Sequence, residues 1–231
     1  MSDTLPILYE DNHLLGVFKR AGLLTQGDRT GDTTALELAK QYLRDAHHKP
    51  GRVFLGLVHR IDRPVSGVLV FARTSKAASR LARSFHDRKV EKTYLAVVVG
   101  GFDDEVGDLE GFVERTHMRS RLAPAASPKA KPAVLSYRVL AARGEFSLLE
   151  VTPRTGRHHQ IRLQLSAAGH PIVGDMKYRA PRALADQSIA LHAARLSFPH
   201  PVREELITLT APPPEGEPWS HFADAIAHYF E

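Results

Sequence analysis

The sequence predicts an α+β fold with a central mixed, mainly antiparallel sheet and flanking helices. Short β-prone runs outnumber the helical segments and do not alternate strictly with them, which disfavours a doubly wound parallel sheet. The chain has 231 residues, of which 43% are hydrophobic and 25% charged, as is typical of a globular protein. No linker of the kind that separates independent domains is visible, so we expect one domain over residues 1–231.

The individual elements are predicted from hydrophobic period and from capping and turn residues. Apolar residues at helical spacing predict helices over residues 34–47, capped by Thr33 or Thr34, and over 75–88, capped by Ser75. A further helix should end at Gly169. The expected strands are residues 7–10, 13–19, 68–71, 93–99, 133–140, 146–151, 189–198 and 206–209, and a last helix is expected at 218–230. The Pro, Ala and Ser content of residues 105–132 predicts an extended, mobile excursion from the sheet.

The composition excludes several classes of site. The chain has no cysteine, which rules out disulfides, thiolate zinc sites, iron–sulfur clusters and cysteine nucleophiles. It has no GxGxxG, Walker, GxSxG or HExxH motif, and its two adjacent histidine pairs point apart on a helix or strand, so we expect no metal site. No apolar run approaches the roughly 20 residues of a membrane span, and no secretory signal opens the chain. We therefore expect a cytoplasmic protein.

Positive charge is concentrated in three stretches of the chain. Residues 73–92 hold seven Lys or Arg and two acids, and residues 114–131 hold five and one. Residues 152–164 add three Arg and two His without an acid. Clustered cations of this kind indicate a face that binds a polyanion, although patchy solvated surface is the alternative for each stretch.

Two polar segments are candidates for chemistry. In the first, HRIDRPVSG at residues 59–67, Asp62 lies between two arginines in a loop after a buried strand. Flanking cations favour its ionised form, but a structural ion pair between strands would have the same pattern. The second segment, TGRHHQIRLQL at residues 155–165, sets cationic groups among apolar ones, as the wall of a site does, or as an exposed basic helix start does.

The order and spacing of three motifs resemble the RluA family of RNA pseudouridine synthases. These motifs are HRIDRPVSGVLVFARTSKAA, EKTYLAVVVG and TGRHHQIRLQLSAAGHPIVGDMKY, and the resemblance runs from about Ile7 to Thr210. It implies the α+β catalytic fold of that family, with a cleft where RNA enters. We expect no S4-type RNA-binding module before it. One departure is Phe18-Lys19-Arg20, where the family usually has Asn-Lys-Pro.

The resemblance also implies roles for individual residues. Asp62 matches the catalytic aspartate, Tyr94 the tyrosine that packs against the target uracil, and Arg162 the arginine that pairs with the catalytic carboxylate. Charge and position suggest further RNA contacts, which we expect at Lys19, Arg60, Arg63, Arg80, Arg83, Arg119, Arg121, Lys131 and His159.

The expected function is isomerisation of specific uridines to pseudouridine in structured RNA, either large-subunit ribosomal RNA or tRNA. The reaction exchanges no electron, phosphate or acyl group, so we expect no cofactor and no metal, and a monomeric enzyme. Two alternatives stay open. One is a catalytically silent RNA-binding protein on the same fold. The other is a two-carboxylate hydrolase, whose second acid would have to be Glu91, Glu150 or Asp175.

Overall fold

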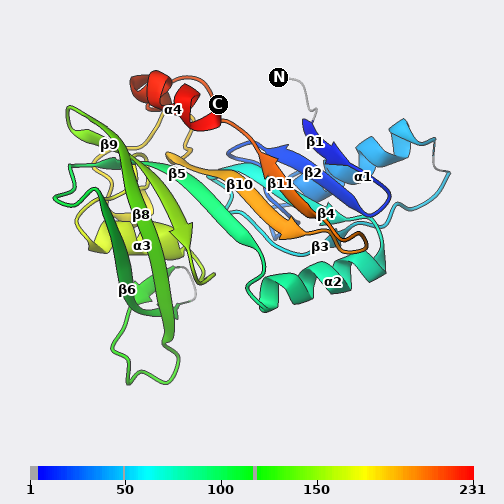
Figure 1. The fold of residues 1–231 in the computed structure, drawn as a ribbon, viewed down its shortest axis with the longest axis horizontal. Coiled ribbons are helices and arrows are strands. Elements are labelled where there is room, and N and C mark those ends of the chain that lie inside the picture. The colour runs from blue at the N-terminus through cyan, green and yellow to red at the C-terminus, as the bar shows by residue number, and fades with distance from the viewer. Residues whose placement is uncertain (1–4, 49, 117–118) are drawn as a thin grey trace. The chain divides into compact units, whose positions relative to one another are not determined.

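The computed structural model describes residues 5–48, 50–116 and 119–231 (Figure 1). Its contacts divide the chain into two compact units, which we call unit 1 and unit 2. Unit 1 comprises Met1–Lys92 and Ala193–Ala211, and unit 2 comprises Thr93–His192 and Pro212–Glu231. Helices flank strands in both, and the strand registers are antiparallel, so the predicted α+β class with a mainly antiparallel sheet is confirmed.

In unit 1 the strands follow the order β1-β2-β4-β10-β11, and β3 also pairs with β4. Their bounds are Ile7–Glu10 for β1, Leu14–Lys19 for β2, Gly56–Leu57 for β3, Ser66–Ala72 for β4, Leu191–Pro199 for β10 and Leu206–Thr210 for β11. All seven residues of β4 are buried, as expected for a continuous apolar run in the middle of a sheet.

Two helices belong to unit 1, α1 (Ala35–Ala46) and α2 (Ser75–His86). The expected cap of α1 is confirmed, because Thr34 forms a full capping box with Glu37. The expected cap of α2 is wrong by one residue: Thr74, not Ser75, is extended and accepts a hydrogen bond from the Ala77 amide at 3.1 Å. The apolar face of α2 packs on the buried side chains of β4, β10 and β11.

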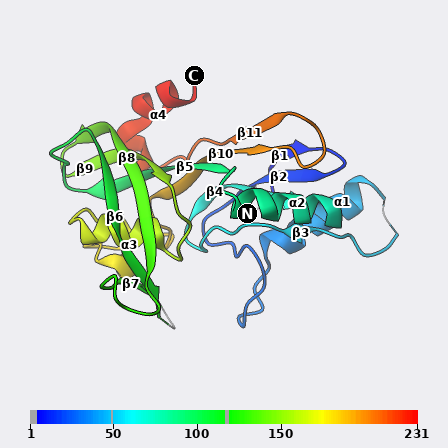
Figure 2. The ribbon, with the colours of Figure 1, turned by 60° about the horizontal axis from the view of Figure 1, so that its bottom comes forward.

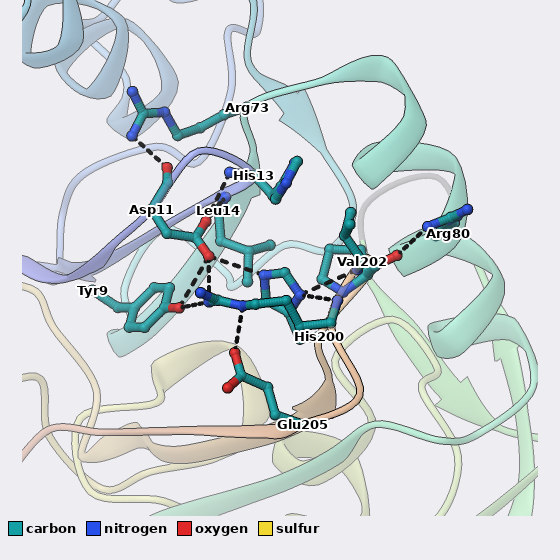
Figure 3. A network of polar contacts seen from close by, with 11 residues as sticks. Tyr9, Asp11, His13, Leu14, Arg73, Arg80, His200, Val202 and Glu205 are labelled. Carbon is teal, nitrogen blue, oxygen red and sulfur yellow. Dashed lines mark hydrogen bonds and ion pairs between the residues drawn. The ribbon is translucent and has the colours of Figure 1, made fainter.

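A polar network joins two turns of unit 1 (Figure 3). The Asp11 carboxylate, in the turn after β1, accepts hydrogen bonds from His200 Nε2 at 2.9 Å and from the Arg203 guanidinium at 2.6 Å. His200 Nδ1 accepts from the backbone amides of Val202 and Arg203, so the ring proton lies on Nε2. The β1–β2 turn is thereby tied to the β10–β11 turn.

In unit 2 the strands follow the order β5-β9-β8-β6-β7. Their bounds are Glu91–Val99 for β5, Val106–Arg115 for β6, Ser120–Leu122 for β7, Lys131–Arg143 for β8 and Phe146–Pro153 for β9. The helical elements are α3 (Gln160–Ala167), η1 (Met176–Tyr178), η2 (Trp219–Phe222) and α4 (Ala223–Phe230). Helix α3 lies beside β6 and β8 (Figure 2), and the Gln164 side chain donates to the Leu109 and Ala133 carbonyl oxygens.

The expectation of a mobile excursion over residues 105–132 is wrong for most of that range. Residues Val106–Val113 pair with Lys131–Arg138 along most of β6, and β7 adds a further short strand. Among the described residues of this range, 123–130 form a turn-rich connection, and there the Pro, Ala and Ser content indicated the structure correctly. Positions 117 and 118, which the expected basic stretch also included, lie outside the described residues.

None of the helices in the described part of the chain has the length and apolar composition that a membrane span requires.

Candidate active site

Asp62 lies in unit 1, in the loop that links β3 to β4. The residue is half-buried, and the Val65 amide donates to its carbonyl oxygen at 3.1 Å, which closes a turn around it. Both flanking arginines are exposed. Arg63 also has protein partners, since its guanidinium donates to the Gly22 carbonyl at 3.0 Å and pairs with Asp32 at 2.8 Å. The loop that carries Asp62 is therefore attached to the loop after β2.

The backbone is fixed on both sides of Asp62. The buried Thr25 hydroxyl donates to the Ile61 carbonyl at 2.8 Å and accepts from the Ile61 amide at 3.4 Å. The Gly22 amide donates to the Arg63 carbonyl at 2.8 Å. These contacts fix the backbone on which the Asp62 side chain is mounted, and a rigid backbone helps to position a functional group.

His59, at the start of the same loop, is held by its ring. His59 Nε2 accepts a hydrogen bond from the Val70 amide at 3.0 Å, and the imidazole stacks on Phe85 with ring centroids 5.0 Å apart. Burial, together with a smaller effect of the positive charge of Lys92, lowers the pKa of His59 to about 3. The imidazole is therefore neutral at physiological pH and serves as an acceptor for the strand backbone.

Lys19, expected among the RNA contacts, has no exposed surface. Its ammonium donates to the carbonyl oxygens of Arg20 at 3.0 Å, Leu23 at 2.8 Å and Arg63 at 3.3 Å. The pKa of Lys19 is lowered to about 7, mainly by burial. The negative charge of Asp62 raises this pKa, and the positive charge of Arg63 lowers it. An enclosed side chain with three acceptors is not open to a phosphate, so the structure favours a role in fixing the Asp62 loop.

Tyr94 and Arg162, the other two expected catalytic residues, belong to unit 2. Tyr94 is half-buried on β5, in register with Val151 of β9. Arg162 is buried in the first turn of α3. Each lies on a regular element within a sheet-and-helix core, which sets its position more tightly than a loop would.

The guanidinium of Arg162 is oriented by a carboxylate on the same unit. Arg162 Nε lies 2.6 Å from one Asp175 oxygen, and a terminal nitrogen lies 2.8 Å from the other. The two side chains are only 6% and 1% exposed. On another side, the Tyr178 ring centroid lies 5.1 Å from the Arg162 Cζ atom. This bidentate pair and aromatic contact together fix the plane of the guanidinium.

The TGRHHQ loop before α3 is also ordered by side chains. The side-chain oxygen Oε1 of Gln160 accepts a hydrogen bond from the Thr155 hydroxyl at 2.8 Å and another from the Arg157 backbone amide at 3.0 Å. His159 has a left-handed backbone with φ of 54°, and its ring bonds the Tyr178 hydroxyl at 2.8 Å. Of the expected RNA contacts, His159 is therefore already engaged with η1.

The remaining expected RNA contacts are exposed and spread over both units. Arg60 and Arg63 lie in the Asp62 loop, and Arg80 and Arg83 lie on α2. Arg80 also donates to the Pro201 carbonyl at 2.7 Å, which anchors the helix. In unit 2 the exposed cations are Arg119, Arg121 and Lys131, at β7 and at the start of β8.

Sequence reasoning missed the roles of Asp175 and Tyr178. It considered Asp175 only as a second acid for hydrolysis, and it left Tyr178 unassigned. A possible signal was the polar Gly174-Asp175 step directly after the apolar residues Ile172 and Val173. Only the fold shows that Asp175 lies against Arg162 of α3.

Comparison with known proteins shows the family to which the chain belongs. The sequence pattern of the RNA pseudouridylate synthase family matches residues 13–167, so the chain belongs to this family, and the named relatives are of its RluA type. It is 31% identical to the ribosomal large subunit pseudouridine synthase D of Borreliella burgdorferi, over 84% of this chain and 61% of that protein. It is 33% identical to the ribosomal large subunit pseudouridine synthase C of Vibrio cholerae, over 89% of this chain and 65% of that protein.

These curated relatives are longer, and the chain spans less than two thirds of the length of both. Among solved structures, human RNA pseudouridylate synthase domain containing 4 superposes with a TM-score of 0.80 at 25% identity, over 96% of this chain and 93% of that one. The predicted fold and the resemblance to the RluA family are thus both confirmed.

Proposed function

We propose that the protein isomerises uridine to pseudouridine in RNA, and that its substrate is large-subunit ribosomal RNA. Family membership supports the reaction, and two of the relatives are named for the large ribosomal subunit. The observation that carries the proposal for this chain is the anchored Asp62 loop. An aspartate held on both sides by Thr25 and Gly22 is what a reaction at a single sugar–base bond requires.

The reaction needs a carboxylate and little else. The bond between C1′ and N1 breaks, the uracil turns, and C1′ bonds to C5; C5 then loses its proton and N1 gains one. The substrate and product are isomers, so no redox partner or group donor takes part. We assign Asp62 the role of the catalytic acid-base or nucleophilic group, and either route needs it ionised.

The family resemblance implies roles for two further residues, both in unit 2. We assign Tyr94 to packing against the target uracil, where its hydroxyl can also exchange a proton. We assign Arg162 to pairing with the catalytic carboxylate. The bidentate contact with Asp175 supports this role, since it holds the guanidinium in one orientation before substrate arrives.

The target base must leave its stack before it reacts, which costs a few kcal/mol. Phosphate contacts offset this cost without reading sequence. The exposed cations proposed for these contacts are Arg60, Arg83, Arg119, Arg121 and Lys131. We further propose that the enzyme acts as a monomer and in the cytoplasm.

Hydrolysis by two carboxylates is less well supported by the contacts. Asp175 is bound on both oxygens by Arg162, and Glu150 pairs with Arg138 at 3.1 Å. Neither acid is free for proton transfer in its present arrangement. The third candidate, Glu91, is exposed at the start of β5.

The direct experiment maps pseudouridine across total RNA from cells with and without the gene. The proposal predicts one or more uridines of large-subunit ribosomal RNA that lose the modification on deletion and regain it on complementation. Complementation with the Asp62→Asn variant serves as the matched control and should not restore it. If the pseudouridines that depend on the gene lie only in tRNA, the substrate is tRNA and not ribosomal RNA. Identical pseudouridine maps in all strains would contradict the proposal.

A further inference from the structure

Two tripeptides of unit 2 share one pattern, with a cation on each side of an inward-facing residue. They are Arg119-Ser120-Arg121 at β7 and Lys177-Tyr178-Arg179 at η1. The central residues are 2% and 5% exposed, while all four cationic residues are exposed. Alternation in and out of the core therefore presents two pairs of positive charges to solvent.

The two tripeptides are joined at their centres. The Ser120 amide donates to the Tyr178 hydroxyl at 3.0 Å, and that hydroxyl contacts the Ser120 carbonyl oxygen at 3.4 Å. A second link comes from the Ser120 hydroxyl, which donates to the His158 carbonyl at 2.6 Å. Segments 58 residues apart in the chain are thus held side by side, and their charged neighbours face a common space.

That space is a cavity of about 640 Å³, lined by all four cations and by the last turn of α3. Its size is within the range of pockets that hold small ligands, about 300–1,000 Å³. None of its described lining residues is acidic. Outside the lining, Glu114 pairs with Arg121 at 3.2 Å. The four cations and Glu114 together carry a net positive charge of about three at neutral pH.

The backbone conformation at Arg179 is consistent with a binding role for this cavity. Its φ is 70°, in the left-handed region that a residue with a side chain seldom adopts. Such strain persists where the surroundings enforce it, and it clusters at binding sites. Here it turns the chain directly after Tyr178, so that Lys177 and Arg179 both line the cavity.

We infer that this cavity, which we call the η1 pocket, binds consecutive phosphates of the RNA backbone. The inference rests on the proposed function and adds to it a place on unit 2 where the strand is held. Tyr178 lines the pocket and also contacts the Arg162 guanidinium, so RNA bound there would lie near the arginine proposed for catalysis. Arginine and lysine together suit phosphodiesters, in which two non-bridging oxygens share one negative charge and both accept hydrogen bonds.

The test measures the affinity for a transcript of large-subunit ribosomal RNA across a salt series. Two double variants remove the charges of either tripeptide, Lys177→Gln with Arg179→Gln, and Arg119→Gln with Arg121→Gln. Each lost phosphate contact lowers the slope of log K against log salt by about 0.7–0.9, so each double variant should lose about 1.4–1.8. Arg182→Gln, an exposed arginine of the same unit outside the pocket lining, is the matched control and should keep the wild-type slope.

Kinetics provide the second readout. Loss of binding shared by the ground and transition states raises KM and leaves kcat unchanged at saturating RNA. Slopes of both double variants that overlay the Arg182→Gln slope, with melting temperatures equal to wild type, would overturn the η1 pocket. That result leaves the proposed function standing if the wild type still forms pseudouridine. A wild type that forms none, with the slopes reduced as expected, would instead contradict the function and retain the pocket.

Discussion

The buried pair of Arg162 and Asp175 gives a prediction with a calculable magnitude. Asp175→Asn keeps the shape of the side chain but removes the negative charge of a carboxylate that binds Arg162 through both oxygens, with the two side chains 1% and 6% exposed. Breaking a buried pair by removal of one partner costs about 3–5 kcal/mol. Because the amide oxygen can still accept one hydrogen bond, we expect the lower end, about 3 kcal/mol, and a fall in melting temperature of about 6–12 °C.

Thermal and urea unfolding measure this change, and a surface pair supplies the control. Asp108 pairs with Arg154 at 3.2 Å with both side chains exposed, so Asp108→Asn should cost less than about 1 kcal/mol. Equal effects of the two substitutions would refute the reasoning, because burial would then not govern the energy of the Arg162 pair.

A double variant separates stability from catalysis. Replacing both partners by apolar residues, Arg162→Met with Asp175→Leu, removes the buried charges together and should recover most of the lost stability. Pseudouridine formation should nevertheless stay lost, since the proposed guanidinium is gone. Recovery of both properties would show that Arg162 has only a structural role.

The remaining predictions concern unit 1. Gly67→Ala should lower the free energy of unfolding, measured in urea, by more than about 3 kcal/mol. The φ angle there is 126°, and the added Cβ would lie 2.3 Å from the Ala193 carbonyl oxygen. The control Gly51→Ala, at a position with open space around it, should change stability little. Lys19, whose folded pKa of about 7 is below its unfolded value, binds a proton more readily in the unfolded chain. Its titration should make stability rise from pH 7 toward 10 by up to about 1.4 kcal/mol per unit, and Lys19→Met should remove that slope; parallel curves for the two proteins would contradict this assignment.

Local signals predicted most of the elements of the fold. Thr34 followed by Glu37 is a complete capping signal within four residues, and the structure uses it. Thr74 and Ser75 offer the same hydroxyl at adjacent positions, so the sequence could not choose between them. Strand β6 was missed because Val113 is its one buried residue, so it has no apolar run of strand length, and its formation depends on pairing with β8.

The candidate site, like the fold, could be predicted from the sequence only in part. The loop around Asp62 was predictable from the proline and glycine of HRIDRPVSG, whereas its catalytic role is implied by the family resemblance and stays a prediction. The partners that fix it were not, because Thr25 lies 36 residues from Ile61 and the Lys19 ammonium reaches back from another strand. Burial converts Lys19 from an expected phosphate contact into an internal donor, and charge alone does not reveal burial.

The central claim, that Asp62 performs the isomerisation, is tested most directly with purified protein and a large-subunit ribosomal RNA transcript. The wild type should convert uridine to pseudouridine with no change in RNA length or mass. Asp62→Asn should bind the RNA with wild-type affinity and a wild-type melting temperature, yet form no pseudouridine. Turnover by Asp62→Asn within about tenfold of wild type, which is a barrier change below about 1.4 kcal/mol, would contradict the assignment.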